Sequence, residues 1–156
     1  GETHGIDLSP LAVATTRKRG GRVVQGDLLG LPYASATFDI VTSFDVLYHA
    51  WVKDDVRAVS ELARVLKPGA RFVILEFATP RFAPLRAIYL FYFRRILPAI
   101  GRLVSKHRDA YTYLPESVLD FPDPGALAAR LGAAGFHDGR FELLTGGICA
   151  IHHGTR

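Results

Sequence analysis

The sequence contains no methionine and only one cysteine, Cys149, among its 156 residues. A single cysteine excludes an internal disulfide, which is typical of a protein kept in a reducing compartment. Cys149 stands in the apolar run 148–151, where we expect it to pack in the core rather than act as a nucleophile. Because there is no initiator methionine and a strand-like segment follows residue 4 directly, we expect a fragment or processed chain without a signal peptide.

Long apolar segments and charge tracts are missing as well. The longest uncharged aromatic run, 87–93, is flanked by arginines and is far shorter than the roughly 20 residues that a membrane-spanning helix requires. The formal net charge of +4 is not concentrated in any tract, so no nucleic-acid partner is expected, and no metal site is expected either. With 49% hydrophobic and 22% charged residues, the composition predicts one globular domain over 1–156.

Strand and helix signals alternate through the first half of the chain. Ser9 is a typical N-cap, Pro10 fits the first position of the helix that follows, and a second helix with an apolar stripe is expected from residue 54 or 55 to Lys-Pro-Gly at 67–69. Strands are expected at Thr3–Leu8, at Arg22–Gln25, at 38–43 (FDIVTS, buried on both faces) and at 71–77 (RFVILEF). This alternation predicts an α/β protein with a parallel sheet and crossover helices.

The second half has a different texture. Residues 79–104 are rich in aromatic side chains and arginine, and their prolines limit the length of any helix. Asp123 is expected to cap a helix that runs to Ala134. The segments 136–144 and 147–153 then predict two strands of an antiparallel hairpin that closes the sheet.

Two aspartates follow successive predicted strands. Asp7 lies at the carboxyl end of the first strand and Asp27 at the end of the next, where the sheet of a doubly wound fold binds its ligands. The Asp7 carboxylate could accept hydrogen bonds from two ribose hydroxyls, Asp27 could accept from an adenine amino group, and the N–H of Leu28 could donate to a ring nitrogen. The alternative is that both residues only cap a helix or a turn.

The loop after the FDIVTS strand is the third candidate segment. It carries Ser43, Phe44, Asp45, Tyr48 and His49, and the predicted topology places it over the reactive end of a ligand held by the two aspartates. His49 is either a catalytic base or a polar residue of a lid, and the sequence leaves both open.

Four segments, in this order and spacing, resemble the core of class I methyltransferases: GIDLS (5–9), QGDLLGLPY (25–33), FDIVTSFDVLYH (38–49) and ELARVLKPG (61–69). The resemblance implies a Rossmann-like sheet and S-adenosylmethionine as the cofactor. It implies that the cofactor is bound by residues that follow three strands, namely Asp7, Leu8, Asp27, Leu28, Ser43 and Phe44.

The C-terminal half resembles a narrower family, the ubiquinone/menaquinone biosynthesis C-methyltransferases. The resemblance rests on LEFATP (75–80), PLRAIYLFYFRRILPAIGRLVS (84–105), YTYLPES (111–117) and LLTGGICAIHHG (143–154). It implies methylation of a ring carbon of a polyprenylated quinol, with 79–121 as an insertion that forms the substrate pocket. Aromatic residues would line this pocket, and the candidates are Tyr89, Phe93, Tyr111 and Tyr113.

Two departures from the family pattern stand out. No GxGxG motif precedes GIDLS, so the first strand and its glycine-rich loop are expected to be missing. That strand would lie between the strands that end at Asp7 and Ser43, and its absence predicts either a gap or altered pairing. The family's Arg-Asn pair is replaced by FDVLYHAW (44–51), which leaves His49 as our candidate base and Tyr48 as the residue that orients it.

Further hypotheses concern location and rival functions. Arg86, Arg94, Arg95 and Arg102 would contact anionic lipid headgroups, so we expect a cytoplasmic protein peripheral to the inner face of the membrane. The rival functions are another small-molecule methyltransferase, a non-catalytic remnant and a nicotinamide-dinucleotide-binding domain. The sequence decides neither the oligomeric state nor whether the ring is a benzoquinol or a naphthoquinol.

Overall fold

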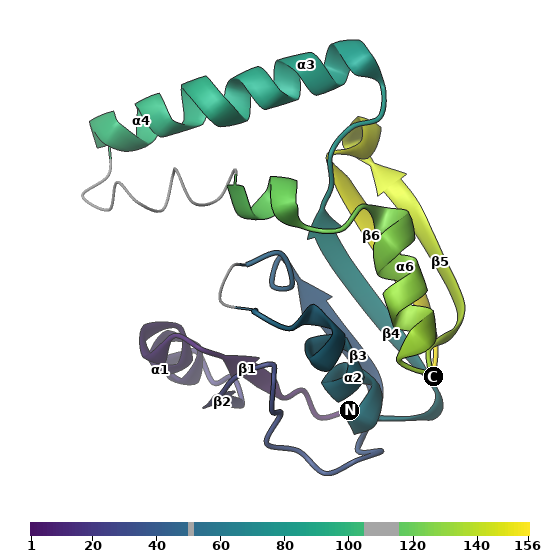
Figure 1. The fold of residues 1–156 in the computed structure, drawn as a ribbon. Helices are drawn as coiled ribbons and strands as arrows, with labels where there is room; N and C mark the ends of the chain where they lie inside the picture. Colours follow the sequence, from purple (N-terminus) through teal and green to yellow (C-terminus); the bar gives the residue numbers. More distant parts are fainter. Residues whose placement is uncertain (50–51, 105–115) are drawn as a thin grey trace.

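The computed structural model describes residues 1–49, 52–104 and 116–156, with the backbone alone for 102–104. Two predicted pocket residues, Tyr111 and Tyr113, therefore lie outside the described residues. The chain alternates strands and helices in its first half and ends in a hairpin (Figure 1). The elements are β1 (Gly5–Asp7), α1 (Pro10–Lys18), β2 (Val23–Gln25), β3 (Phe38–Phe44), α2 (Asp55–Val65), β4 (Leu66–Phe77), α3 (Ala83–Phe91), the π-helix η1 (Tyr92–Ile96), α4 (Leu97–Val104), α6 (Pro124–Ala133), β5 (His137–Leu144), the 3₁₀ turn η2 (Thr145–Gly147) and β6 (Cys149–Thr155).

The strands form two separate sheets. The first pairs β1 with β2 in parallel, and the second has the order β3-β4-β6-β5. In the second sheet, β3 and β4 are parallel, whereas β6 runs antiparallel to both of its neighbours. The predicted α/β class and the closing antiparallel hairpin are thus confirmed.

Local capping explains where the helices begin. The Ser9 hydroxyl accepts a hydrogen bond from the N–H of Ala12, and Asp54 accepts from Arg57, as the sequence predicts for N-caps. Helix α2 ends at Val65, before Lys-Pro-Gly at 67–69 as predicted, but β4 begins at Leu66 and not at Arg71, so the chain passes directly from the helix into the strand. Lys67 consequently lies in the sheet, where its ammonium contacts the Asp39 carboxylate at 2.8 Å, and does not lie at the helix end.

The main core lies between the four-stranded sheet and the helices α2 and α6, which cover one face of it (Figure 1). Phe72 and Ile74 project from β4 into this core, and Leu62 reaches it from α2. The ring centroids of Phe72 and Phe136 are 4.3 Å apart. The alternation along β4 thus fixes which of its side chains face the helices.

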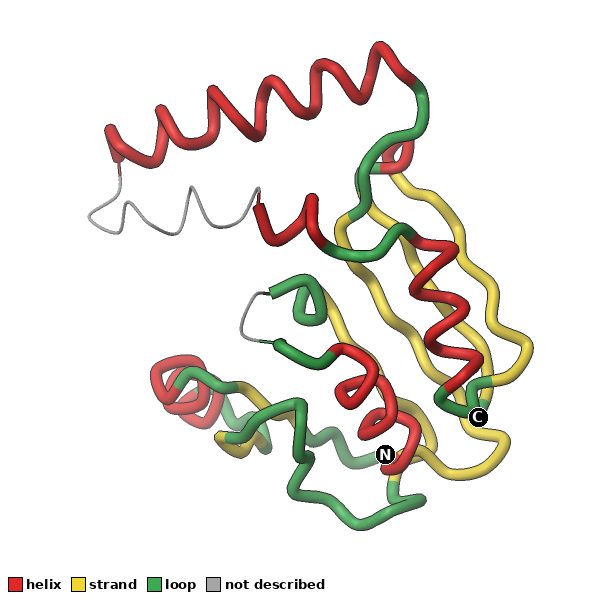
Figure 2. Tube along the Cα trace, viewed as in Figure 1, coloured by secondary structure: helices red, strands yellow, loops and turns green. Residues whose placement is uncertain are grey.

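The strand β3 does not match its prediction. A strand buried on both faces was expected, but Ile40 is 56% exposed and Phe44 is 54% exposed. The reason is its position: β3 is an edge strand, and β1 and β2 form a sheet apart from it (Figure 2). The alternative of a gap between the strands that end near Asp7 and Ser43 is therefore confirmed.

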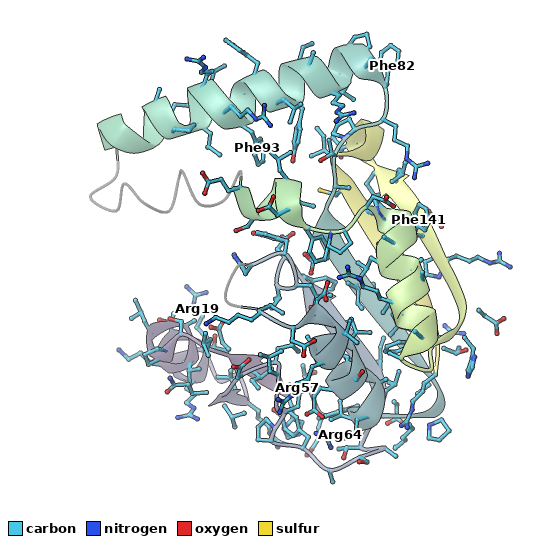
Figure 3. All side chains as sticks on the ribbon, viewed as in Figure 1. Arg19, Arg57, Arg64, Phe82, Phe93 and Phe141 are labelled. Carbon is cyan, nitrogen blue, oxygen red and sulfur yellow. The ribbon has the colours of Figure 1, made fainter. Side chains whose placement is uncertain are left out.

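Helices α3 and α4 join through η1 into one long rod that crosses the end of the sheet (Figure 1). Tyr89 and Phe93 anchor the rod, because both are buried and their ring centroids lie 4.4 Å apart. Figure 3 shows Phe93 on the side of the rod that faces the rest of the molecule, whereas Phe82 marks its outer beginning. Among the described residues, no helix combines the length and the apolar character needed to cross a membrane.

Candidate functional site

A cavity of about 280 Å³ opens at the carboxyl ends of β1, β2 and β3. It brings together five of the six predicted cofactor residues, and the sixth, Ser43, is buried outside the lining. The cavity therefore lies between the small sheet and the edge of the large one. Its lining consists of Ile6, Asp7, Leu8, Gly26, Asp27, Leu28, Phe44, Asp45, Val46, His49 and Val52.

The two aspartates are held by local turns. The Oδ1 atom of Asp7 accepts from the N–H of Ser9 at 2.8 Å, and Oδ1 of Asp27 accepts from the N–H of Leu29 at 2.9 Å. Both carboxyl groups thus hold a local turn, and their role in binding a ligand stays a prediction. Each turn also fixes its carboxyl group at the cavity wall, and among the described residues the Oδ2 atoms make no hydrogen bond.

His49 stands where this cavity meets a second one of about 400 Å³. Burial lowers the pKa of His49, and the nearby Asp45 carboxylate opposes this effect. The imidazole is therefore neutral near pH 7 and able to accept a proton. Tyr48, whose ring centroid is 4.3 Å from that of His49, lines only the second cavity.

The second cavity is the more polar of the two. It lies between the loop that carries Tyr48 and His49, the segment 116–122 and α6. Arg130 of α6 forms an ion pair with Asp55 of α2 in its wall. The other lining residues are Leu47, Val52, Lys53, Glu116, Ser117, Asp120, Phe121 and Pro122.

Glu76 is a residue that the sequence analysis did not single out. It lies at the end of β4, is only 1% exposed, and accepts hydrogen bonds from the N–H groups of Val46 at 3.1 Å and Leu47 at 2.9 Å. Burial raises the pKa of Glu76 to about 7, although those N–H groups oppose the shift. An acidic residue at an inward position of the apolar run RFVILEF was the signal that could have found it.

Two residues of the ELARVLKPG motif hold the loop between Asp27 and β3 in place. Nε of Arg64 donates to Glu61 at 2.6 Å, while the same guanidinium donates to the carbonyls of Tyr33 at 2.8 Å and Leu31 at 3.0 Å. Glu61 in turn accepts from the N–H of Leu31 at 2.7 Å. Arg64 (labelled in Figure 3) and Glu61 thus clamp the loop between Asp27 and β3, which makes the motif structural.

The predicted pocket aromatics Tyr89 and Phe93 pack in a second core cluster together with Tyr48 and Val118. Neither lines the two cavities above. The hydroxyl of Tyr89 is buried and has no hydrogen-bond partner among the described residues, and burial raises its pKa to about 12. The pair connects the long helical rod to Tyr48, and a role in lining a substrate pocket stays a prediction.

Comparison with known proteins gives a consistent family. The model of the ubiE/COQ5 methyltransferase family matches residues 12–156. The demethylmenaquinone methyltransferase of Thermus thermophilus is 43% identical over 99% of this chain and 72% of its own length. That of Streptomyces griseus is 45% identical over 97% of this chain and 65% of its own length, so the chain spans about two thirds of these relatives.

Solved structures resemble the fold at low sequence identity. A SAM-dependent methyltransferase from Thermotoga maritima superimposes with a TM-score of 0.69 and 19% identity, over 97% of this chain and 72% of the other. One from Aquifex aeolicus gives a TM-score of 0.62 and 17% identity, over 99% of this chain and 68% of the other. The arrangement of strands and helices is thus that of class I methyltransferases.

Proposed function

Because the chain belongs to the ubiE/COQ5 methyltransferase family, we propose that its smaller cavity binds S-adenosylmethionine. We further propose that the methyl group goes to a ring carbon of a polyprenylated quinol, namely a demethylmenaquinol. The observation that carries the cofactor proposal is the pairing of two carboxylates, Asp7 and Asp27, on one wall of a cavity whose other wall bears His49. The substrate proposal rests on the names of the relatives.

The residues of the cavity fit a nucleoside. In the proposal, the Oδ2 atom of Asp7 accepts from the ribose hydroxyls, because Oδ1 already holds the turn to Ser9. Asp27 accepts from the adenine amino group in the same way, since its Oδ1 is engaged with Leu29. Leu28 and Phe44 contribute apolar walls for the flat base.

For this reaction, the chain must position the quinol ring and remove the proton of its hydroxyl group. The bound sulfonium supplies an electrophilic methyl group, and a quinol ring carbon attacks it well only when the neighbouring hydroxyl loses its proton. His49, neutral and placed between the two cavities, accepts that proton in our proposal, and Tyr48 orients it. Such base catalysis contributes about 10²–10⁴-fold to the rate.

Calorimetry separates the rival functions. We expect S-adenosylhomocysteine to bind the chain and NAD not to bind. Stronger binding of NAD would identify a dinucleotide-binding domain, and binding of neither would identify a non-catalytic remnant; both results would contradict the proposal. If the chain binds S-adenosylhomocysteine but does not methylate demethylmenaquinol, it is better assigned as a methyltransferase that acts on another small molecule.

The role of His49 is tested separately. We expect His49→Ala to lower methyl transfer by about 10²-fold or more while the affinity for S-adenosylhomocysteine stays within a few-fold of the parent. His4→Ala is the matched control, because His4 lies away from this cavity. Unchanged turnover in the His49 variant would remove this residue from the mechanism.

We also propose that the rod of α3, η1 and α4 rests on an anionic lipid surface. Its exposed side chains include Ile88, which is 67% exposed, and Phe91, which is 60% exposed. Arg94 and Arg95, three and four residues after Phe91, are exposed too. Apolar groups flanked by arginines are complementary to a bilayer with acidic headgroups, where a polyprenylated substrate would reside.

Co-sedimentation with vesicles tests this contact. We expect binding to phosphatidylglycerol vesicles, weak binding to phosphatidylcholine vesicles, and loss of binding in the double variant Ile88→Ser, Phe91→Ser. Leu11→Ser is the control, because Leu11 is exposed on α1, far along the chain from the rod. Equal sedimentation of parent and double variant would contradict the proposal, and so would self-association through this face in the absence of lipid.

A further inference from the structure

Glu76 is a buried carboxyl group without a cationic partner among the described residues. It faces the same side of β4 as Phe72 and Ile74, and the described ion pairs do not include it. One of its oxygens, Oε2, is buried with no hydrogen-bond partner among the described residues. A carboxylate in such surroundings destabilises the fold, so its presence calls for another physical role.

The other oxygen holds a turn of backbone. Oε1 accepts from the N–H groups of both Val46 and Leu47, and the backbone of Tyr48 also favours the charged form of Glu76. N–H groups of consecutive residues that point at one anion form a concave anion-binding site. Here the anion is a side chain of the protein itself, and the site is the loop that leads to His49.

The same loop contains a strained residue. Asp45 has a φ of 54°, in the left-handed region that non-glycine residues rarely adopt. Its N–H donates to the carbonyl of Leu75 at 2.9 Å, and the next N–H, that of Val46, donates to the Glu76 carboxyl group. Two consecutive residues of β4 therefore bind two consecutive residues of the loop. Strained backbone persists only where the surrounding contacts enforce it, and Leu75 and Glu76 supply those contacts.

We propose that Glu76 is a positioning residue, whose carboxyl group clamps the loop 45–49 and thereby fixes His49 at the junction of the two cavities. Asp45, Val46 and His49 all line the smaller cavity, so releasing the clamp moves one whole wall of it. This inference rests on the proposed function for its consequence in catalysis. The clamp itself is a property of the fold and can be measured without a ligand.

The charge of Glu76 sets the strength of the clamp. Asp45 on the loop acts on Glu76 directly, His49 and Cys149 are coupled to Asp45, and Tyr89 is coupled to Cys149. The buried His152 of β6 lies opposite Ile74, on the same face of the sheet as Glu76. Asp45 raises the pKa of Glu76, and Cys149 and Tyr89 are both neutral near pH 7, because burial raises the pKa of each. Because burial raises the pKa of Glu76 to about 7, ionisation of Glu76 favours an opening of the loop that admits water to the carboxyl group, so a rise in pH through 7 should loosen the loop and acidification should tighten it.

Amide hydrogen exchange measures the clamp directly. We expect the protection factors of the Val46 and Leu47 amides, relative to the Ile74 amide, to fall by about tenfold between pH 5.5 and pH 8. The variant Glu76→Gln keeps the shape and one acceptor oxygen but cannot ionise, so it should show the parent's pH 5.5 value at both pH values. Glu142→Gln is the control on an exposed glutamate and should behave as the parent.

Ligand binding supplies the second readout. The affinity of the parent for S-adenosylhomocysteine should weaken on going from pH 5.5 to pH 8, and Glu76→Gln should lose this dependence. A pH-independent ratio of protection factors in the parent would overturn the proposal, even if the variant does not fold. If the chain fails to bind S-adenosylhomocysteine while the amide titration appears, the proposed function fails and the clamp stands.

Discussion

The small sheet with α1 and the four-stranded sheet with α2 and α6 differ sharply in how much they bury. In β1, α1 and β2, the buried apolar side chains are Val13 and Val23, while Leu11 is 75% exposed. The four-stranded sheet and its helices hold the main core, which includes Phe72 and Leu127. One protein thus combines a well-packed body with a lightly packed unit at its side.

The candidate cavity has one wall on each of these parts. Asp7 and Asp27 belong to the lightly packed unit, whereas Asp45 and His49 belong to a loop fixed by Glu76 of the large sheet. Binding of a ligand between the walls should therefore order the small unit more than the body. We therefore expect the nucleoside side of the cavity to be deformable and the proposed catalytic side to be rigid.

The largest effect should come from the body. Phe72→Ala removes a ring that is almost fully buried against Phe136, so we expect a loss of about 3–5 kcal/mol in the free energy of unfolding. Urea denaturation followed by circular dichroism measures it. A loss below about 1 kcal/mol would show that the body is not better packed than the small unit.

The pH dependence of the free energy of unfolding should also reflect a residue of the four-stranded sheet. Because the folded-state pKa of Glu76 is raised to about 7, the folded protein binds more protons than the unfolded chain between pH 4.5 and pH 7, and stability falls as the pH rises through this window. In Glu76→Gln this loss is absent. From pH 5.5 to pH 8, the stability of the variant relative to the parent should therefore increase by about 2 kcal/mol.

His152, in the same sheet, should change the stability with pH in the opposite direction to Glu76. Burial lowers its pKa, and its Nε2 atom lies 3.0 Å from the carbonyl of Pro124. The stability that it contributes is present above its ordinary pKa of 6.5 and is lost as the pH falls below it. A Glu76→Gln variant whose stability relative to the parent does not change with pH would contradict the buried, ionisable state of Glu76.

A smaller effect should separate binding from stability in the small unit. Asp7→Asn and Asp27→Asn keep the turn hydrogen bonds, because the amide oxygen still accepts from Ser9 or Leu29. Each should weaken S-adenosylhomocysteine binding by about tenfold, with little change in the unfolding midpoint. Asp39→Asn is the control on an exposed aspartate outside the cavity, and equal weakening there would refute a specific role.

The smallest effect should be local. Val13→Ala removes two methyl groups from the contact between α1 and its sheet, which should cost about 1–2 kcal/mol. Hydrogen exchange should accelerate in α1 and β2 while β4 and β6 keep their protection. Equal acceleration in both sheets would show that the two parts unfold as one unit.

Much of this molecule could be predicted from local sequence signals. Ser9, Asp54 and Asp123 cap helices as expected, because capping depends only on a few adjacent residues. The exposure of β3 could not be predicted from its apolar run, since exposure depends on which strand lies beside it. The start of β4 at Leu66 was missed for a similar reason: Leu66 pairs with Phe38, so the sheet begins directly after α2.

The site was predicted less completely. Asp7, Asp27 and His49 were found because they follow strands, and the sheet brings strand ends together. Glu76 was missed because its role depends on contacts about 30 residues away, at Val46 and Leu47, which no local pattern reveals. Tyr89 and Phe93 were expected in a pocket, but aromatic side chains also fill cores, and only the packing shows where they lie.

The most direct test of a shared binding site is a titration of the isotope-labelled chain with S-adenosylhomocysteine, followed by amide chemical shifts. We predict saturable shifts on both walls together, at residues 7–8 and 26–28 and at residues 45–49, with NAD producing none of them. Shifts confined to one wall, or an equal response to NAD, would contradict the claim that the two sheets jointly form a site for the methyl donor.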